Sequence, residues 1–233
     1  MNKAIILLSA GLDSTVSLAM AKEQGADIQL ALTFDYGQKS AKKELEQSQK
    51  IAQHYQVPWE NIHLPWLAKI TNTALSKTSE MALPEVDISE LDQVTSVTLK
   101  SAKSVWVPNR NGVFINIAGA YADRYGYDTI LVGFNAEEAV TFPDNTPQYA
   151  ETVTQSLAFS TQTQTQVKSA ILNLNKVEII QEALKLKVPL ELIWSCYKEG
   201  NTHCGQCESC NRLKRGLENN GASDILNLLF GEI

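Results

Sequence analysis

The chain has 233 residues, 44% hydrophobic and 20% charged, a composition that excludes an intrinsically disordered protein. Twenty Lys and Arg against 26 Asp and Glu give a net charge of −6, which argues against a nucleic-acid partner. No apolar run approaches the ~20 residues needed to span a bilayer. The apolar run near the N-terminus, residues 4–8, is too short to be the hydrophobic core of a signal peptide. We therefore expect a cytoplasmic protein with no membrane partner.

Short apolar runs alternate along the chain with segments of helical periodicity. They predict strands at residues 3–8, 28–34, 61–64 and 129–133, and helices at 13–22, 39–55, 111–125 and 175–186. This alternation predicts an α/β fold, a Rossmann-like, doubly wound parallel sheet with right-handed crossovers. Ligands of such sheets bind at the carboxyl ends of the strands, where the strand order reverses.

Two stretches interrupt this alternation. Residues 71–105 are rich in Ser, Thr and Lys and have weak periodicity, which predicts an insertion or a mobile lid. Residues 141–166 contain two prolines and many Thr and Gln residues, so we expect this segment to begin as a loop.

Residues 9–15, Ser-Ala-Gly-Leu-Asp-Ser-Thr, follow the first strand and open a helix. Small residues let the backbone turn sharply, so that N–H groups and the helix N-terminus face an anion. Ser9, Ser14 and Thr15 add hydroxyl donors, and Asp13 is placed to cap the helix or to help hold a metal. The segment fits neither the usual NTPase loop nor the dinucleotide fingerprint. It predicts a phosphate site, with a plain strand-to-helix turn as the alternative.

All four cysteines lie within fifteen residues, at Cys196, Cys204, Cys207 and Cys210. Four thiolates at these spacings fit tetrahedral Zn²⁺ with no open position, a structural site that couples metal binding to folding. An iron–sulfur cluster stays open as an alternative, because closely spaced cysteines also ligate such clusters. We interpret His203 as a bystander, because four sulfurs complete the shell.

The loop resembles the pyrophosphate-binding loop Ser-Gly-Gly-x-Asp-Ser of the adenylating ATP pyrophosphatase (PP-loop) superfamily, which has the HUP-type form of the Rossmann-like sheet. Its members cleave ATP between the α- and β-phosphates and transfer AMP to a substrate oxygen. Ala10 replaces the usual first glycine, and we expect its methyl group to restrict positive φ and to crowd the phosphates. The ATP-binding residues that the resemblance implies are Leu8, Ser9, Ala10, Gly11, Leu12, Asp13, Ser14, Thr15, Val16, Ser17, Leu18, Asp35 and Tyr36. The alternative for Asp35 and Tyr36 is a turn that only ends the strand and binds no ligand.

Further segments resemble the family of 7-cyano-7-deazaguanine synthases. They are Phe-Asp-Tyr-Gly-Gln at 34–38, Val-Pro-Asn-Arg-Asn at 107–111, Gly-Phe-Asn-Ala at 133–136, Trp-Ser-Cys-Tyr at 194–197 and the cysteine run at 204–210. The resemblance implies a carbon–nitrogen ligase of queuosine and archaeosine precursor biosynthesis. It would convert 7-carboxy-7-deazaguanine and ammonia into the nitrile with ATP, Mg²⁺ and Zn²⁺, and it would form a homodimer. Residues 1–190 are then the adenine-nucleotide-binding domain, and 191–233 the C-terminal zinc-binding segment.

The same resemblance implies residue roles. The catalytic candidates are Asp13, Ser14, Arg110 and Lys176. We expect Arg110 or Lys176 to stabilise the leaving pyrophosphate or the substrate carboxylate; the alternative is that each is a surface cation. A lysine at a helix start opposes the helix dipole, which favours a functional reason for Lys176. The candidates for the guanine-like edge of the substrate are Asn135, Glu137, Glu138 and Asp144, with a solvated loop as the alternative.

Residues 138–147 depart from the family pattern. Many members carry Asp-Tyr-Ser-Gly-Tyr-Pro-Asp-Cys-Arg-Pro there, whereas this chain has Glu-Ala-Val-Thr-Phe-Pro-Asp-Asn-Thr-Pro. The departure leaves open a relative that joins the activated carboxylate to another amine or stops at the amide. A tRNA-thiolating enzyme would need a spare cysteine and a basic surface, and a zinc-stapled binding module would leave the loop unexplained. No glutaminase domain fits this length, so ammonia comes free or from a partner.

Overall fold

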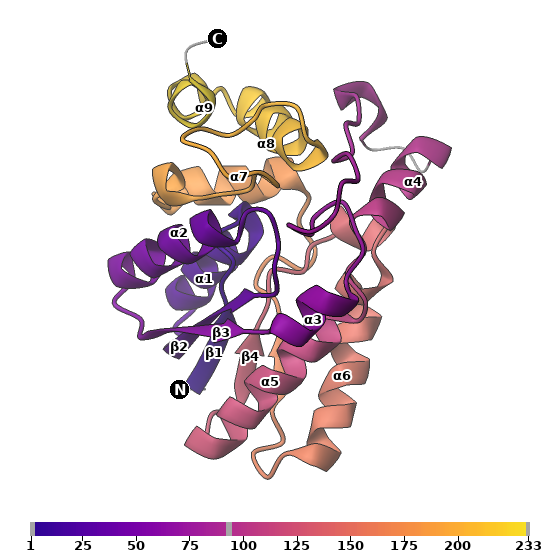
Figure 1. The fold of residues 1–233 in the computed structure, drawn as a ribbon. Coiled ribbons are helices and arrows are strands. Elements are labelled where there is room, and N and C mark those ends of the chain that lie inside the picture. Colours follow the sequence, from indigo (N-terminus) through magenta and orange to yellow (C-terminus); the bar gives the residue numbers. More distant parts are fainter. Residues whose placement is uncertain (1–2, 92–94, 232–233) are drawn as a thin grey trace.

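The computed structural model describes residues 3–91 and 95–231 (Figure 1). Five parallel strands form one sheet in the order β3-β2-β1-β4-β5. The strands are β1 Lys3–Leu7, β2 Asp27–Asp35, β3 Trp59–His63, β4 Thr129–Leu131 and β5 Gln166–Lys168. The α-helices are α1 Leu12–Glu23, α2 Ala41–His54, α3 Pro65–Ile70, α4 Ser96–Ser104, α5 Arg110–Tyr125, α6 Pro147–Ser160, α7 Lys176–Lys185, α8 Glu208–Asn219 and α9 Ser223–Phe230.

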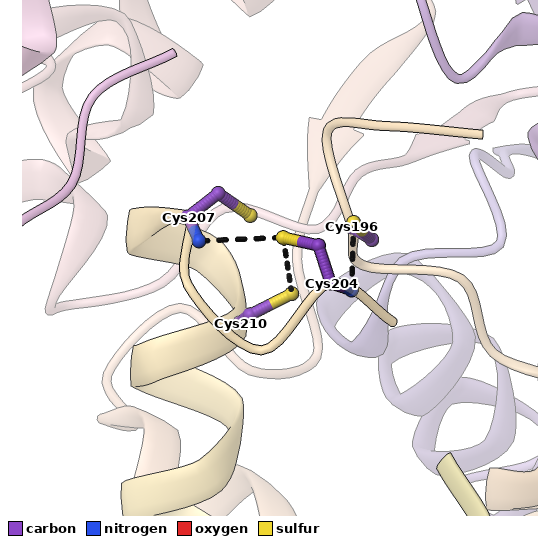
Figure 2. A group of neighbouring side chains, drawn as sticks. All are labelled: Cys196, Cys204, Cys207 and Cys210. Carbon is purple, nitrogen blue, oxygen red and sulfur yellow. Dashed lines mark hydrogen bonds between the residues drawn. The ribbon is translucent and has the colours of Figure 1, made fainter. Parts of the chain in front are cut away.

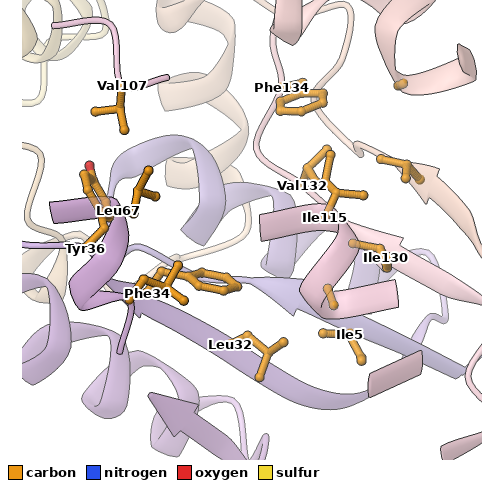
Figure 3. Packing of buried hydrophobic residues seen from close by; sticks show 14 of the residues in the cluster. Ile5, Leu32, Phe34, Tyr36, Leu67, Val107, Ile115, Ile130, Val132 and Phe134 are labelled. Carbon is orange, nitrogen blue, oxygen red and sulfur yellow. The ribbon is translucent and has the colours of Figure 1, made fainter. Parts of the chain in front are cut away.

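Helices cover both faces of the sheet. Ile5 and Ile6 are neighbours in β1, both fully buried, and their side chains join different apolar clusters. Ile5 packs with residues of α5 and α6, such as Ile115 in Figure 3, and Ile6 packs with residues of α1 and α2. Strands buried on both faces explain the uninterrupted apolar runs in the sequence. The α/β, Rossmann-like fold predicted from those runs is confirmed.

The C-terminal segment packs against the same core. Leu213 and Leu217 of α8 share an apolar cluster with Leu12 and Val16 of α1 and with Ile180 of α7. Figure 1 shows α7, α8 and α9 stacked at one end of the molecule. The division into residues 1–190 and 191–233 stays a prediction, and the structure adds that side chains of both parts share one cluster.

Two segments contain more regular structure than the sequence predicts. Residues 147–160 form α6, which begins at Pro147, and the Thr146 hydroxyl accepts a hydrogen bond from the backbone N–H of Tyr149. These are ordinary start signals, but Thr and Gln residues hide the periodicity that follows. The predicted lid contains α4 after an irregular stretch, and its residues 92–94 lie outside the described part. Its mobility stays a prediction.

Along the ranges that the structure describes, no helix has the length and apolar character needed to cross a membrane.

Candidate active site and cysteine cluster

A cavity of about 300 Å³ lies at the carboxyl ends of β1, β2 and β4. Strand β1 pairs with β2 on one side and with β4 on the other, so the strand order reverses there. This is the position where open α/β sheets bind ligands. Its walls come from the loop after β1, the end of β2, the first turns of α5 and α7, and residues 194–197.

The loop after β1 leaves the N-terminus of α1 open. Gly11 is the N-cap and supplies no side-chain acceptor, so of the two alternatives for Asp13 the helix cap is wrong and the metal ligand stays a prediction. The Ser9 and Ser14 hydroxyls lie 3.2 Å apart, and both residues line the cavity. The N–H of Leu12 donates to the Ser195 hydroxyl, but among the described residues the N–H groups of Asp13 and Ser14 have no acceptor, and together with the two hydroxyls they are suited to bind an anion.

Ala10 does not crowd the cavity. Its φ is +64°, in the left-handed region, which costs an L-residue roughly 1–2 kcal/mol. The residue is fully buried in the cluster that contains Leu8 and Leu18, and it does not line the cavity. Its carbonyl oxygen accepts a hydrogen bond of 2.8 Å from the backbone N–H of Trp194. The methyl group is therefore accommodated in the core, contrary to our expectation.

Six of the predicted ATP-binding residues lie outside the cavity lining. They are Ala10, Thr15, Val16, Ser17, Leu18 and Asp35. The Thr15 hydroxyl donates to the carbonyl of Gly11, and the Ser17 hydroxyl donates to that of Val132, both at 2.8 Å. Their hydroxyls are thus used inside the protein. The structure does bring to the cavity Leu8, Ser9, Gly11, Leu12, Asp13, Ser14 and Tyr36.

A buried lysine joins the loop to two distant segments. Lys176 is the first residue of α7, and its Nζ lies 2.6 Å from Asp13 Oδ2 and 3.1 Å from Glu138 Oε1. Burial opposes the charge of Lys176, but the two carboxylates outweigh it and raise the pKa of the ammonium group. Lys176 is therefore a charged group in the cavity and not a surface cation.

The two carboxylates beside Lys176 differ. Burial raises the pKa of Asp13 despite the lysine, whereas at Glu138 burial is outweighed by Lys176 and Arg212 together, which lower the pKa. The second oxygen of Asp13, Oδ1, is buried and has no hydrogen-bond partner among the described residues. A carboxylate oxygen without a partner next to a phosphate-type loop fits a Mg²⁺ ligand.

One of the four predicted substrate residues lines the cavity. Glu138 lines it, but Asn135, Glu137 and Asp144 do not. Asn135 is fully buried, and its Oδ1 accepts a hydrogen bond from the backbone N–H of Glu138. The Glu137 carboxylate accepts one from the backbone N–H of Lys176 at 3.0 Å. Asn135 and Glu137 thus use these oxygens within the protein, and the assignment of the four candidates to the substrate stays a prediction.

Arg110 lies at the first position of α5 and lines the cavity beside Tyr36. Its Nη1 is 3.3 Å from the Tyr36 hydroxyl oxygen, to which it donates. Tyr36 and Asp144 outweigh burial and raise the pKa of Arg110, so its charge is retained.

Other cavity residues had no role assigned from the sequence, and of these Gln38 and Ser195 lie within the quoted motifs, whereas Ser40, Glu44 and Arg212 lie outside them. The Ser195 hydroxyl accepts a hydrogen bond of 3.2 Å from the backbone N–H of Leu12, which ties the cysteine segment to the loop. Arg212, on α8, forms ion pairs with Glu137 and Glu208. The only sequence signal for Arg212 as a cavity residue is the helical periodicity of the segment that follows Cys210.

The four cysteine sulfurs lie within 4.8 Å of one another (Figure 2). The backbone N–H groups of Cys204 and Cys207 donate to sulfurs of the cluster, each at 3.4 Å. Hydrogen bonds from the other thiols lower the pKa of Cys196, and the same contacts raise the pKa of Cys207 and of Cys210. A cation would allow all four to ionise together.

His203 is not one of these ligands. Its Nε2 accepts a hydrogen bond from the backbone N–H of Ser195, and its ring packs against Trp194 and Phe230. Cys196 also lines the cavity, so the cluster lies directly beside it.

The parallel sheet, its order and the loop at its switch point define an α/β protein with a Rossmann-like fold and a ligand cavity at that point. The family model described as "Queuosine biosynthesis protein QueC" matches residues 3–221, and the chain belongs to this family.

Among similar proteins, those named 7-cyano-7-deazaguanine synthase match nearly the whole chain. The protein from Methanosarcina mazei is 45% identical, over 96% of this chain and 97% of its own length. The protein from Carboxydothermus hydrogenoformans is 49% identical, over 94% of this chain and 100% of its own length. Among solved structures, the U34-tRNA thiolase NcsA from Methanococcus maripaludis is 14% identical, with a TM-score of 0.48, over 98% of this chain and 70% of that one.

Gly133 provides a test of the close contact between β4 and the loop. A Cβ atom at this position would lie 2.9 Å from the backbone nitrogen of Ser14. We expect Gly133→Ala to displace the loop and to weaken ATP binding about 10-fold, because small displacements in a site are costly. Gly126→Ala is the matched control: nothing lies within 4 Å of its Cβ, but its φ of +70° carries the strain of a left-handed alanine. Equal ATP affinities of the two variants in titration calorimetry would contradict the expectation.

Proposed function

We propose that the chain converts 7-carboxy-7-deazaguanine and ammonia into 7-cyano-7-deazaguanine at the expense of ATP. The observation that carries the proposal is the buried Lys176–Asp13 pair beside the open N-terminus of α1, in a chain that belongs to the QueC family. The relatives' name, 7-cyano-7-deazaguanine synthase, supports the product. The cytoplasmic location and the homodimer expected from the sequence belong to the same proposal.

The chemistry requires activation of an unreactive group. A carboxylate is anionic at neutral pH and resists nucleophiles. Transfer of AMP from ATP to a carboxylate oxygen releases pyrophosphate and makes that oxygen part of a leaving group. Ammonia then displaces AMP and loses a proton, which gives the amide. A second ATP adenylates the amide oxygen, and loss of AMP and two protons leaves the nitrile.

Different cavity residues bind the phosphates, stabilise the departing pyrophosphate and contact the acceptor substrate. The N–H groups at the start of α1 and the Ser9 and Ser14 hydroxyls bind phosphate oxygens. Lys176 carries the positive charge that stabilises the departing pyrophosphate. Arg110, which lies beside Tyr36 at the end of β2, contacts the acceptor substrate. Bound Mg²⁺ neutralises phosphate charge, and the unpartnered Oδ1 of Asp13 is the oxygen suited to hold it.

The metal of the cysteine cluster is zinc in this proposal. Four sulfurs form a closed set, and a zinc ion with four thiolates has no open position for a substrate. Its contribution is structural: Cys196 adjoins Ser195 and Trp194, and both of these form hydrogen bonds with the loop after β1.

A second candidate activity stops at the amide or uses another amine. Phe142 and Asn145 line the cavity, and both lie in the segment that departs from the family pattern. The wall that meets the acceptor therefore differs from that of many family members, which keeps this candidate open. The mass of the product separates the two.

Asp13→Ala tests the assignment of the loop. We expect it to abolish AMP formation that depends on 7-carboxy-7-deazaguanine, because it removes both the partner of Lys176 and the free oxygen. Metal content and the circular dichroism spectrum should not change. The matched control is Asp87→Ala, since this exposed aspartate caps a short turn and does not line the cavity. Retained AMP release in Asp13→Ala would contradict the assignment.

A further inference from the structure

The Glu44 carboxyl group faces the candidate cavity from the first turn of α2. Its Oε1 accepts a hydrogen bond from the Ser40 hydroxyl at 2.5 Å, and its Oε2 accepts one from Gln38 Nε2 at 2.8 Å. Ser40 and Gln38 are buried and line the same wall. Each carboxylate oxygen can accept a second hydrogen bond. Glu44 is thus held in one orientation with acceptor capacity left toward the cavity.

Glu44 differs from the other carboxylates of the cavity. Asp13 and Glu138 also line it, but both are paired with Lys176. Among the described residues, no lysine, arginine or histidine lies within ion-pair distance of Glu44. The two paired carboxylates serve the phosphate end. Glu44 is therefore the cavity carboxylate that remains for another part of a ligand.

The surroundings of Glu44 favour a ligand that donates hydrogen bonds. Burial raises the pKa of Glu44, although Ser40, Gln38 and the charge of Arg110 oppose this change. Two N–H donors from a ligand would replace the lost water and stabilise the ionised form. Phe114 packs against Tyr36 and lines the cavity as well, so a flat ring would find an aromatic wall nearby.

The donor pattern of the ring distinguishes the two heterocycles in the reaction. A guanine-like ring presents a ring N–H and an amino group side by side, and a carboxylate accepts from both. Adenine presents an amino group beside a ring nitrogen that has a lone pair, which a carboxylate oxygen repels. We propose that Glu44 selects the acceptor substrate by binding the 2-amino-4-oxopyrimidine edge of its ring. This inference rests on the proposed function and names the residue that recognises its substrate.

Calorimetric titration of the metal-loaded protein tests the inference. We expect Glu44→Gln to weaken binding of 7-carboxy-7-deazaguanine by about 10²-fold, because hydrogen bonds to a charged group contribute about 1.5–3 kcal/mol. ATP affinity should change less than about 3-fold, since its ring does not meet this carboxylate. Glu46→Gln is the matched control, because Glu46 lies on the same helix but is exposed and pairs with Lys50.

A ligand analogue provides a second test of the inference, which can be made on the unaltered protein. The analogue without the 2-amino group should bind the unaltered protein about 10-fold or more weakly, and Glu44→Gln should add little further loss. If Glu44→Gln weakens ATP instead, or leaves both affinities unchanged, the inference is overturned. An unaltered protein that binds ATP but not the deazaguanine would contradict the proposed function itself.

Discussion

Lys176→Met is expected to lower the rate of AMP formation by about 10²–10³-fold, the usual effect of removing one well-placed electrostatic donor. Its Nζ is buried between Asp13 and Glu138, and no other lysine lines the cavity among the described residues. The rate should fall in single-turnover measurements with saturating ATP, because the lost interaction develops as pyrophosphate departs.

The same substitution should also destabilise the protein. It leaves two partly buried carboxylates without their cation, and because breaking a fully buried pair costs about 3–5 kcal/mol, the loss should not exceed this range. Urea unfolding at pH 7 measures this loss, and the rate is measured below the unfolding transition. Lys185→Met is the matched control, since Lys185 lies on the same helix but is exposed and pairs only with Glu182. An AMP rate within a factor of about three of the unaltered protein would rule out the role of Lys176.

Removal of the metal from the cysteine cluster is expected to lower Tm by at least about 10 °C. Structural zinc contributes about 10 kcal/mol in small peptides, and each kcal/mol shifts Tm by roughly 2–4 °C in a domain of this size. ATP affinity should fall as well, since Trp194 and Ser195 tether the loop beside Cys196. Calorimetry after chelation measures both effects, and chelator already loaded with zinc is the control.

The metal itself is identified by elemental mass spectrometry. One zinc per chain is the expected result, and Cys210→Ser should lose it, because Cys210 is fully buried within the cluster. An unchanged Tm after complete metal loss would contradict the structural role. Iron with sulfide in place of zinc would support the iron–sulfur alternative.

The sequence predicted those parts of the site that depend on residues close to one another in the chain. A loop of small residues between an apolar run and a helix is a local pattern, and it correctly predicted that Ser9, Asp13 and Ser14 lie at the switch point of the sheet. The spacing of the cysteines likewise predicts their convergence. Lys176 was found because a lysine is unfavourable at a helix start, and the structure shows its compensation by two carboxylates.

The parts that the sequence did not predict depend on tertiary contacts. Glu44 and Arg212 reach the cavity from helices whose sequences look ordinary, and only packing decides which helix face meets it. Glu137 and Asp144 lie in the predicted segment, but the turns of the chain there direct Glu138, Phe142 and Asn145 into the cavity instead. Ala10 was expected to crowd a phosphate, and the left-handed turn instead places its methyl group in the core.

The product formed from 7-carboxy-7-deazaguanine, ATP, Mg²⁺ and ¹⁵N-ammonium tests the central claim most directly. Mass spectrometry of the reaction should show 7-cyano-7-deazaguanine that carries one ¹⁵N atom, together with two AMP for each nitrile. The amide as the final product would favour the second candidate activity. No AMP release in the presence of all four components would contradict the account.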